Sequence, residues 1–219
     1  MNILYEDSDV IVCHKPASMA TQTARIGEKD MLSELKNYLY SVNGHDSYVG
    51  LIHRLDQGVE GVLVFAKKPS AAANLSHQIT EHAMKKSYYA VVYGDMKQQS
   101  AALTDYLIKN SKDNLSRVVS ADTKGAKKAE LNYRCIRSDE VRKLHMLQIE
   151  LITGRHHQIR VQLAHQGLPI VNDFKYGYYG DKIGKDGIAL CAYKLCFYHP
   201  VTRREMEFEI KPVSGIFQG

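Results

Sequence analysis

The stretch that decides the fold is residues 51–68, which read L-I-H-R-L-D-Q-G-V-E-G-V-L-V-F-A-K-K. Two apolar runs, 49–52 and 62–66, flank a polar segment, and the second run is continuously apolar, as expected for a strand buried on both faces. Gly58 and Gly61 allow backbone angles that other residues resist, which favours a tight turn of fixed shape. The pattern therefore predicts that Asp56 is displayed on a rigid loop between two strands.

The same stretch is also consistent with an ordinary surface hairpin. An isolated Asp-x-Gly is usually a turn in which the carboxylate has no chemical role. The rest of the chain has to distinguish the two interpretations. Before residues 51–68, the patterns predict a strand-turn-strand unit at 3–15 with its turn at 7–9, a loop at 21–29 and a helix at 31–40 capped by Asp30. After them, they predict a helix at 70–84 that follows Pro69, a strand at 85–94, and strands at 129–137 and 144–153. A helix at 157–166 ended by Gly167 and a hairpin of 188–198 with 205–210 complete the predicted elements.

Length and composition are those of an ordinary globular protein. The chain has 219 residues, 44% of them hydrophobic and 24% charged, which is enough to bury a core as one large domain or two small lobes. No run approaches the ~20 apolar residues of a membrane helix, and the acidic start predicts no secretory signal. We therefore expect a cytoplasmic protein. The net charge of +5 is compatible with nucleic acid binding but does not argue for it alone.

Neither a disulfide framework nor a metal site is predicted. The cysteines show no C-x-x-C pairing and lie inside apolar runs, so we expect buried free thiols at Cys13, Cys135, Cys191 and Cys196. His157 and His165 are eight residues apart and are poorly aligned on an ideal helix, so these histidines and His156 do not predict metal binding. The basic run Lys124, Lys127 and Lys128 is either a solvated face or a surface for RNA phosphates.

Five ordered motifs carry a resemblance to a known family. The sequence H-R-L-D followed by G-V-L-V-F-A-K resembles the central motif of the RluA-type (ribosomal large subunit pseudouridine synthase A) family of RNA pseudouridine synthases. The Lys-Pro at 15–16, the K-x-Y-x-A-x-V-x-G at 86–94, the T-G-R-H-H-Q-I-R-V segment at 153–161 with its D-x-x-Y-G at 173–177, and the final H-P at 199–200 are similar to the family's other motifs. The resemblance covers about residues 3 to 212.

The resemblance implies roles for particular residues. It makes Asp56 the catalytic residue, Tyr88 the active-site tyrosine and Arg160 the partner of the catalytic carboxylate. Spacing alone favours the interpretation of Tyr88 as an ordinary strand residue in an alternating pattern. The remaining positions that we predict to bind substrate are His53, Arg54, Lys86, Arg155, His157 and Gln158.

The resemblance also implies a fold and a reaction. The expected fold is α+β, a mixed and mainly antiparallel sheet with flanking helices and a central catalytic cleft, in a single domain of residues 1–219 without an S4 domain. The expected activity is the isomerisation of uridine in ribosomal or transfer RNA to pseudouridine by a monomer that needs no cofactor, metal or membrane. The reaction moves the base from N1 to C5, so it requires an ionised carboxylate, a cation that stabilises it and a pocket for an extruded base. Whether the carboxylate attacks base or sugar is left open.

One departure from the family leaves alternatives open. Val59 and Glu60 stand where the family usually has Thr-Ser, so a non-catalytic RNA-binding descendant is the second hypothesis. A hydrolase that uses Asp56 and Glu60 as a carboxylate pair is a third and weaker one, because their geometry is not constrained by the sequence. We expect Glu60 to add negative charge beside Asp56 and to repel RNA, unless Arg54 or a nearby lysine neutralises it.

Overall fold

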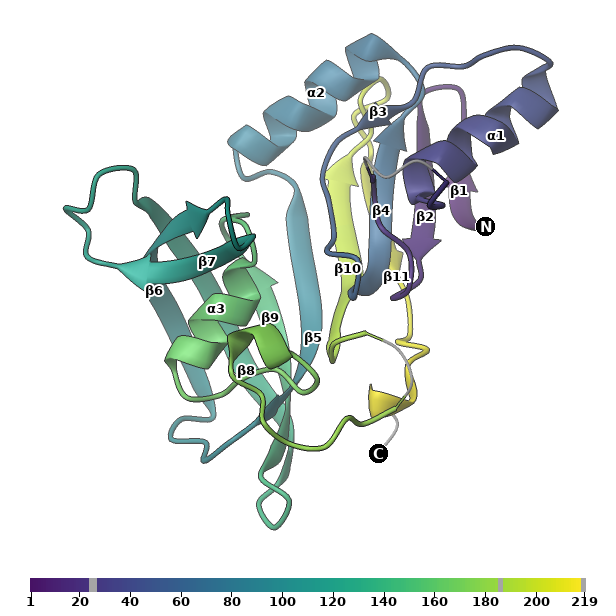
Figure 1. The fold of residues 1–219 in the computed structure, drawn as a ribbon. Helices are drawn as coiled ribbons and strands as arrows, with labels where there is room; N and C mark the ends of the chain where they lie inside the picture. The colour runs from purple at the N-terminus through teal and green to yellow at the C-terminus, as the bar shows by residue number, and fades with distance from the viewer. Residues whose placement is uncertain (24–26, 185–186, 218–219) are drawn as a thin grey trace. The chain divides into compact units, whose positions relative to one another are not determined.

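The computed structural model describes residues 1–23, 27–184 and 187–217 (Figure 1). The chain divides into two compact units. The first unit contains Met1–Lys85 and Ala192–Pro212, and the second contains Lys86–Cys191 and Val213–Gly219. The first unit is therefore built from both ends of the chain. The prediction of a single domain stays a prediction.

The first unit is organised around strand β4 (Glu60–Ala66), all seven residues of which are buried. β2 (Val10–Lys15) pairs with it in antiparallel register, and β1 (Asn2–Glu6) pairs with β2. β10 (Leu190–Tyr198) is the other neighbour of β4, while β3 (Gly50–Leu51) pairs with β4 and β11 (Glu205–Glu209) with β10. The central position of β4 confirms its prediction as a strand buried on both faces.

Helix α1 (Met31–Asn43) begins where the sequence predicts and ends one turn later. The carboxylate of Asp30 accepts a hydrogen bond from the backbone N–H of Ser33 at 2.7 Å, which is the expected N-cap. Gly44 then adopts a left-handed conformation with φ 74° and its N–H donates to the carbonyl of Tyr40. A glycine is favoured at this position because other residues resist positive φ.

Helix α2 (Pro69–Thr80) starts with a proline in its first turn, as predicted, but it ends at Thr80 and not at Met84. His82 has a φ of 54°, which stops the helix. The N–H groups of Ala83 and Met84 then both donate to the carbonyl of Gln78. The prediction was wrong here because Ala83 continues the apolar spacing of the helix although the backbone has already turned.

The second unit contains a five-stranded antiparallel sheet in the order β5-β9-β8-β6-β7. Its strands are β5 (Lys85–Tyr93), β6 (Ser100–Asn110), β7 (Leu115–Val119), β8 (Lys127–Asp139) and β9 (Leu144–Leu151). β5, β8 and β9 confirm their predictions. β6 and β7 were not predicted, because most of their residues are exposed or half-buried and apolar and polar residues do not alternate regularly along them.

Helix α3 (Gln158–His165) follows β9 through the Thr-Gly-Arg turn. Six consecutive residues from Gln158 to Leu163 are buried. The polar side chains of Gln158, Arg160 and Gln162 are therefore among the buried residues of this unit. Gly167 has a φ of 75° and follows the helix as predicted. Two short 3-10 helices, η1 (Phe174–Tyr176) and η2 (Gly215–Phe217), complete the elements of the described residues.

The α+β fold class is confirmed, and two smaller predictions need correction. Cys13, Cys191 and Cys196 are buried free thiols, but Cys135 is half-buried, at an irregularity in the pairing of β8 with β9. The run 49–52 forms only the two-residue strand β3. Of the loop predicted at 21–29, residues 24–26 lie outside the described part of the chain. Among the described helices, none has the length and apolarity needed to cross a membrane.

Candidate active site

Asp56 is half-buried and lies in the loop between β3 and β4, as the sequence predicts. Its carbonyl accepts a hydrogen bond from the N–H of Val59 at 3.0 Å, which closes a tight turn. The preceding residue is fixed as well, because the hydroxyl of Thr21 donates to the carbonyl of Leu55 at 2.8 Å and accepts from its N–H at 3.1 Å. The loop is thus held on both sides of Asp56.

A buried lysine anchors this loop through hydrogen bonds to backbone carbonyls. Lys15 is fully buried, and its ammonium donates to the carbonyl oxygens of Pro16 at 2.9 Å, Met19 at 2.5 Å and Gln57 at 3.2 Å. An ammonium has three N–H donors, and these carbonyls accept all three. Gln57 directly follows Asp56, so the lysine sets the backbone next to the predicted catalytic carboxylate.

The charge of Lys15 is balanced by acidic neighbours. Burial lowers the pKa of this lysine to about 8, while the negative charges of Asp56 and Glu60 act in the opposite direction. From the sequence, Lys15-Pro16 was predicted to end a strand and was matched to a family motif, but Lys15 was given no role. The signal that was available is the lysine itself, since a lysine at the end of an apolar strand is rarely buried without an anionic or carbonyl partner.

The glycines of the loop have different roles. Gly58 does not adopt a positive φ, so the turn itself does not require a glycine. Gly61 has a φ of 151°, and a Cβ at this position would lie 2.4 Å from the Cβ of Ala192 and 2.6 Å from its carbonyl oxygen. No side chain fits at that distance. Gly61 therefore allows β4 to approach β10 directly after the Asp56 loop.

Glu60 is not a surface charge. Its side chain is 2% exposed, and one carboxylate oxygen lies 3.7 Å from Nε2 of His14, which is itself 10% exposed. The negative charge of Glu60 also raises the pKa of Lys15. Lys15 is thus a nearby lysine of the kind that the sequence allowed as a neutralising partner of Glu60. Of the two alternatives that the sequence left open, these contacts favour neutralisation by a nearby lysine, because β4 carries Glu60 into the interior of the first unit.

His53 and Arg54 flank the same loop. The N–H of Val64 donates to Nε2 of His53 at 3.4 Å, so this ring lies against β4. Arg54 is exposed, and its guanidinium donates to the carbonyl of Gln22 at 3.4 Å. Their predicted roles in binding substrate stay predictions.

In the second unit, Tyr88 and Lys86 lie on β5. Tyr88 is 6% exposed and is paired in register with Ile149 of β9. Lys86 is half-buried, and burial lowers its pKa to about 8. The role predicted for Lys86 in binding substrate stays a prediction.

Arg160 of α3 is buried and forms a two-pronged ion pair with Asp173. Its Nε donates to one carboxylate oxygen at 2.7 Å and its Nη2 to the other at 2.8 Å, and the two side chains are 8% and 1% exposed. The ring of Tyr176 lies with its centroid 4.9 Å from the guanidinium carbon. Sequence analysis matched Asp173 and Tyr176 to a motif but gave them no role. The pairing of Arg160 with Asp56 stays a prediction, since the two residues belong to different units.

The turn before α3 is organised by Gln158. Its amide oxygen accepts from the hydroxyl of Thr153 at 2.8 Å and from the N–H of Arg155 at 2.9 Å, while its amide nitrogen donates to the carbonyl of Glu130 at 3.0 Å. Gln158 is 3% exposed, so these contacts give it a role in shaping the turn. Arg155 is exposed, with Nε donating to the carbonyl of Lys128. The substrate roles predicted for both remain to be tested.

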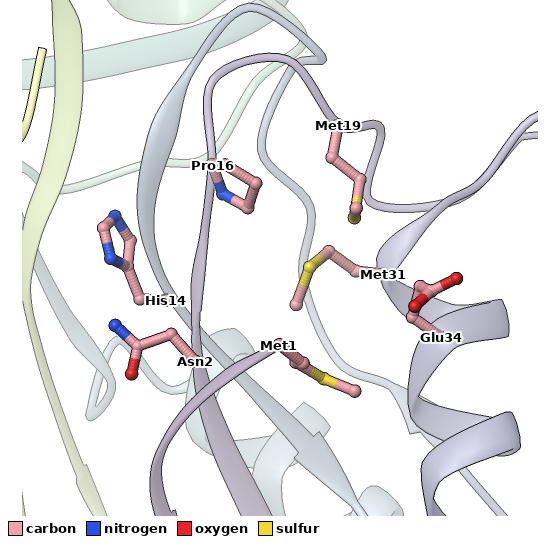
Figure 2. Close-up of a pocket in the computed structure, with 7 residues that line it drawn as sticks. All are labelled: Met1, Asn2, His14, Pro16, Met19, Met31 and Glu34. Carbon is pink, nitrogen blue, oxygen red and sulfur yellow. The ribbon is translucent and has the colours of Figure 1, made fainter.

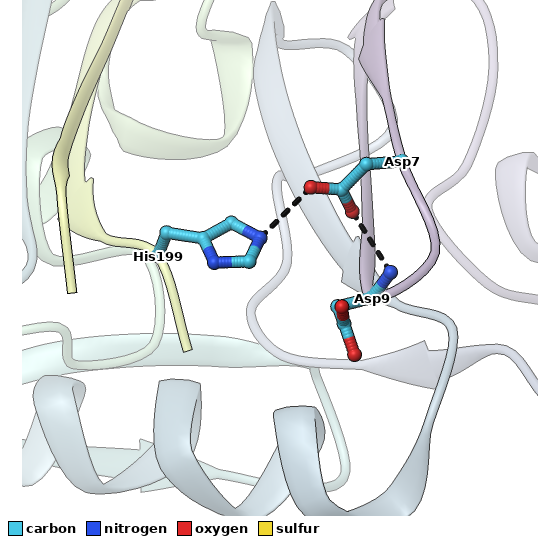
Figure 3. A group of neighbouring side chains, drawn as sticks. All are labelled: Asp7, Asp9 and His199. Atoms are coloured by element: carbon cyan, nitrogen blue, oxygen red, sulfur yellow. Dashed lines mark hydrogen bonds and ion pairs between the residues drawn. The ribbon is translucent and has the colours of Figure 1, made fainter. Parts of the chain in front are cut away.

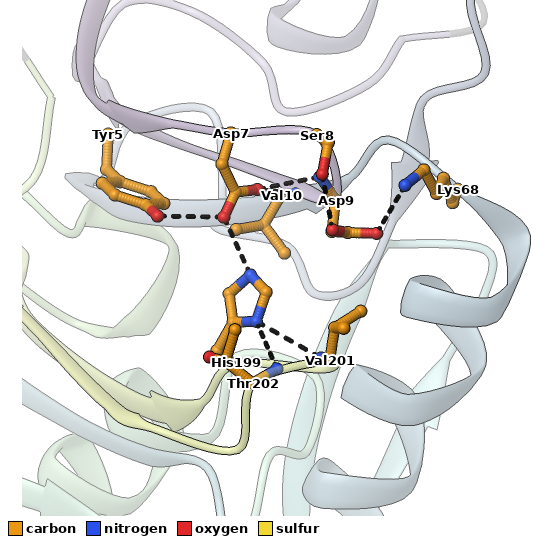
Figure 4. A network of polar contacts seen from close by, with 9 residues as sticks. All are labelled: Tyr5, Asp7, Ser8, Asp9, Val10, Lys68, His199, Val201 and Thr202. Carbon is orange, nitrogen blue, oxygen red and sulfur yellow. Dashed lines mark hydrogen bonds and ion pairs between the residues drawn. The ribbon is translucent and has the colours of Figure 1, made fainter.

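One cluster in the first unit has the composition of a metal site. Asp7, Asp9 and His199 offer ligand atoms that lie within 4.8 Å of one another (Figure 3). His199 Nδ1 accepts from the N–H groups of Val201 and Thr202, so its proton is on Nε2, which donates to Asp7 at 2.8 Å (Figure 4). The imidazole is therefore already oriented as a hydrogen-bond donor and not as a metal ligand.

The carboxylates of this cluster are also engaged. Asp7 accepts from the N–H groups of Asp9 and Val10, both at 2.8 Å, and from the hydroxyl of Tyr5. Burial raises the pKa of Asp7, but the hydrogen bonds outweigh this effect and lower it. Asp9 pairs with Lys68 at 2.9 Å, which lowers its pKa. The cluster fastens the final His-Pro motif to the turn between β1 and β2.

A cavity of about 230 Å³ lies beside α1 in the same unit (Figure 2). Three methionines dominate its wall, and the polar groups are few. The lining residues that define its character are Met1, Met19, Met31, Pro16, His14 and Glu34. A mainly apolar wall with one carboxylate does not suit an RNA phosphate, and the cavity is distinct from the Asp56 loop.

The fold and the loop carrying Asp56 define an α+β protein of the pseudouridine synthase class. Residues 9–165 match the model of the RNA pseudouridylate synthase family, and the chain belongs to this family. It is 33% identical over 202 residues to "Uncharacterized RNA pseudouridine synthase YhcT" of Bacillus subtilis, covering 92% of this chain and 65% of that protein. It is 32% identical over 210 residues to "Ribosomal large subunit pseudouridine synthase C" of Buchnera aphidicola, covering 93% and 64%. The chain thus spans just under two thirds of these relatives.

Solved structures show the same fold. "Human RNA Pseudouridylate Synthase Domain Containing 4" superposes with a TM-score of 0.78 at 20% identity, covering 97% of this chain and 89% of that one. "Human RNA Pseudouridylate Synthase Domain Containing 1" gives the same TM-score at 19% identity, covering 96% and 83%. The predicted pseudouridine synthase fold is thereby confirmed.

Proposed function

We propose that this chain is an RNA pseudouridine synthase in which Asp56 is the catalytic carboxylate. The observation that carries the proposal is the fixed loop around Asp56. Lys15 uses one of its three N–H donors on the carbonyl of Gln57, and Thr21 holds both backbone groups of Leu55. A carboxylate held in this way is prepared for a reaction that depends on its position.

The reaction needs no group from outside the substrate. The bond from N1 to C1′ breaks, the detached uracil turns, C5 bonds to C1′, and C5 loses its proton while N1 gains one. Asp56 supplies the carboxylate on which either a base-directed or a sugar-directed route depends. Tyr88 stacks on the extruded uracil and supplies its phenol for hydrogen bonding, and Arg160 stabilises the anionic form of Asp56.

We further propose large-subunit ribosomal RNA as the first substrate to test. Relatives of Buchnera aphidicola and Vibrio parahaemolyticus, 32% and 31% identical to this chain, carry the name ribosomal large subunit pseudouridine synthase C. Transfer RNA is the alternative. Direct mapping of pseudouridine by chemical labelling, in RNA from cells with and without the protein, distinguishes the two substrates.

The central experiment measures tritium release from RNA labelled at C5 of uridine. We expect the wild-type protein to release tritium and Asp56→Asn to release none, because the amide is nearly isosteric but cannot act as an anionic nucleophile. Asp46→Asn is the matched control, since Asp46 is an exposed carboxylate of the same unit. Release by Asp56→Asn at the wild-type rate would refute the role of Asp56. RNA binding without release by the wild type would favour the non-catalytic descendant.

A further inference from the structure

The guanidinium of Arg160 is fixed in the second unit by two residues that have no assigned role. Asp173 binds the edge formed by Nε and Nη2, with distances of 2.7 and 2.8 Å. Because the guanidinium is planar, holding this edge also fixes the direction of its end, which carries Nη1 and the second N–H of Nη2. Asp173 is 1% exposed, so water does not compete for the pair.

Tyr176 fixes the remaining freedom of the same group. Its ring covers one face of the guanidinium, with the centroid 4.9 Å from the Arg160 carbon. Such a contact is attractive and restricts rotation about the bond to Nε. Tyr176 comes three residues after Asp173, in the short helix η1, so one short segment supplies both contacts.

The hydroxyl of Tyr176 is held from two sides. The backbone N–H of Ser116 on β7 donates to it at 2.8 Å, and Nδ1 of His157 lies 2.8 Å away. Since Ser116 N–H can only donate, the hydroxyl hydrogen is available to donate to His157.

His157 is itself constrained. It has a φ of 53° and directly precedes α3, and its ring stacks on that of His156 at 3.8 Å between centroids. The hydroxyl of Ser116 in turn lies 2.9 Å from Nδ1 of His156 and donates to its carbonyl at 2.8 Å. The hydroxyl of Tyr176 therefore connects β7, η1 and the start of α3.

We propose that Asp173 and Tyr176 are positioning residues that act through Arg160. Asp173 sets the plane and direction of the guanidinium, and Tyr176, anchored by Ser116 and His157, keeps it there. This inference rests on the proposed function, in which Arg160 stabilises the catalytic carboxylate. An alternative is that the contacts only stabilise the fold, and the experiment must separate the two.

Tyr176→Phe is the informative variant, because it keeps the ring over Arg160 and removes only the hydroxyl contacts. Its matched control is Tyr178→Phe. Tyr178 is a buried tyrosine of the same segment whose hydroxyl donates to the carbonyl of Asp181 at 2.9 Å, and its ring lies against Tyr93 and Phe174. Tyr176→Phe removes two hydroxyl contacts and Tyr178→Phe removes one, so a purely structural effect should slow both variants.

In single-turnover tritium release, we expect Tyr176→Phe to be slowed about tenfold at saturating RNA, with the RNA concentration for half-maximal rate changed less than threefold. Tyr178→Phe should turn over at the wild-type rate. Asp173→Asn should be slowed at least a hundredfold, and Asp173→Glu should recover part of that loss. Equal rates for Tyr176→Phe and Tyr178→Phe would overturn the positioning role of Tyr176, as wild-type turnover by Asp173→Asn would for Asp173.

A second measurement does not depend on activity. The Nε–H of Arg160 should give a slowly exchanging signal in ¹⁵N NMR spectra, assigned by its loss in Arg160→Lys. We expect this signal to persist in Tyr178→Phe, to exchange faster in Tyr176→Phe and to disappear in Asp173→Asn. If the Nε–H signal of Arg160 is unchanged in Asp173→Asn, the inference is overturned, even where the wild-type protein releases tritium as expected. Absence of tritium release from the wild-type protein, with these NMR changes present, would instead contradict the proposed function.

Discussion

The two units hold their key cations in opposite ways. In the first unit, Lys15 is bound by three backbone carbonyls of loops. In the second, Arg160 is bound by the side chains of Asp173 and Tyr176. Because its acceptors are backbone carbonyls, Lys15 fixes the backbone conformation of the loops that it contacts. Side-chain acceptors can be replaced one at a time, so Arg160 can be separated from the fold that surrounds it.

The largest effect should come from breaking the side-chain arrangement at Arg160. We expect Arg160→Met to lower turnover by three orders of magnitude or more and to cost about 3–5 kcal/mol of unfolding free energy, because it leaves the carboxylate of Asp173 buried without its partner. Affinity for RNA should fall little, since one of many cationic contacts is lost.

The double variant Arg160→Met with Asp173→Leu sharpens this test. Replacing a buried ion pair by apolar residues is often neutral or stabilising, so the unfolding free energy should recover while activity does not. Urea denaturation and tritium release on the same samples measure both. Recovery of activity in the double variant would show that Arg160 matters only for the fold. Weakened RNA binding with normal turnover in the single variant would make Arg160 a phosphate contact.

Breaking the backbone arrangement should mainly affect stability. Lys15→Met leaves three loop carbonyls without their buried donor, and we expect a loss of about 3 kcal/mol, allowing for partial hydration. Lys68→Met is the control, because Lys68 is half exposed in its pair with Asp9 and should cost below about 1 kcal/mol. A backbone carbonyl cannot be removed by a side-chain substitution. We therefore expect no second-site change to restore the stability of Lys15→Met in the way that Asp173→Leu restores that of Arg160→Met. Equal midpoints for the two lysine variants in urea would contradict the role of Lys15.

A pH profile tests the same lysine without mutation. The folded-state pKa of Lys15, about 8, lies below its usual value of 10.5. Its lowered pKa means that the unfolded state binds more protons between these values, so this residue makes stability rise with pH there. Activity should move the other way, falling about fivefold between pH 8 and pH 9 as the protonated fraction of Lys15 drops from about one half to about one tenth. The opposite slopes of turnover and melting temperature are the expected signature.

Lys86 could produce the same decline, because its pKa is also lowered to about 8. The variant Lys86→Met separates the two lysines. If Lys15 is responsible, the variant keeps the alkaline decline of single-turnover rate at saturating RNA. A flat profile in Lys86→Met would assign the decline to Lys86 and leave the loop unaffected by pH.

The smallest effect is expected at Val59 and Glu60. Both are buried, so the paired change Val59→Thr with Glu60→Ser should alter turnover only a few-fold. The change should be nearly the same at low and high salt, because buried charges are screened far less than exposed ones. A gain in RNA binding that shrinks as salt rises would mean that Glu60 faces the RNA after all.

The elements that the sequence revealed are those in which one local signal dominates. β4 is a continuous apolar run, and Asp30 precedes α1 as a capping residue should. The end of α2 was missed because His82 adopts a positive φ that its residue type does not announce. β6 and β7 were missed because their apolar residues do not follow the alternation on which the recognition of a strand depends.

In the candidate site, too, some features could be recognised from the sequence and others could not. Asp56 and its loop were recognisable from a motif of consecutive residues. The anchoring of that loop was not, because Lys15 and Gln57 are 42 positions apart and the acceptor is a backbone atom that any residue would supply. The pair of Arg160 and Asp173 spans only 13 positions, but nothing in a single sequence says which carboxylate a buried arginine selects.

Gly61 has a consequence for how the protein is made. The strand that follows the Asp56 loop packs through this glycine against Ala192, which is encoded near the other end of the chain. At about 5–20 residues per second, β10 leaves the ribosome on the order of ten seconds after β4. During that interval the nascent chain has an exposed edge on β4 and an incomplete setting for Asp56. The timing of translation therefore ensures that the Asp56 loop matures only after β10 has been synthesised.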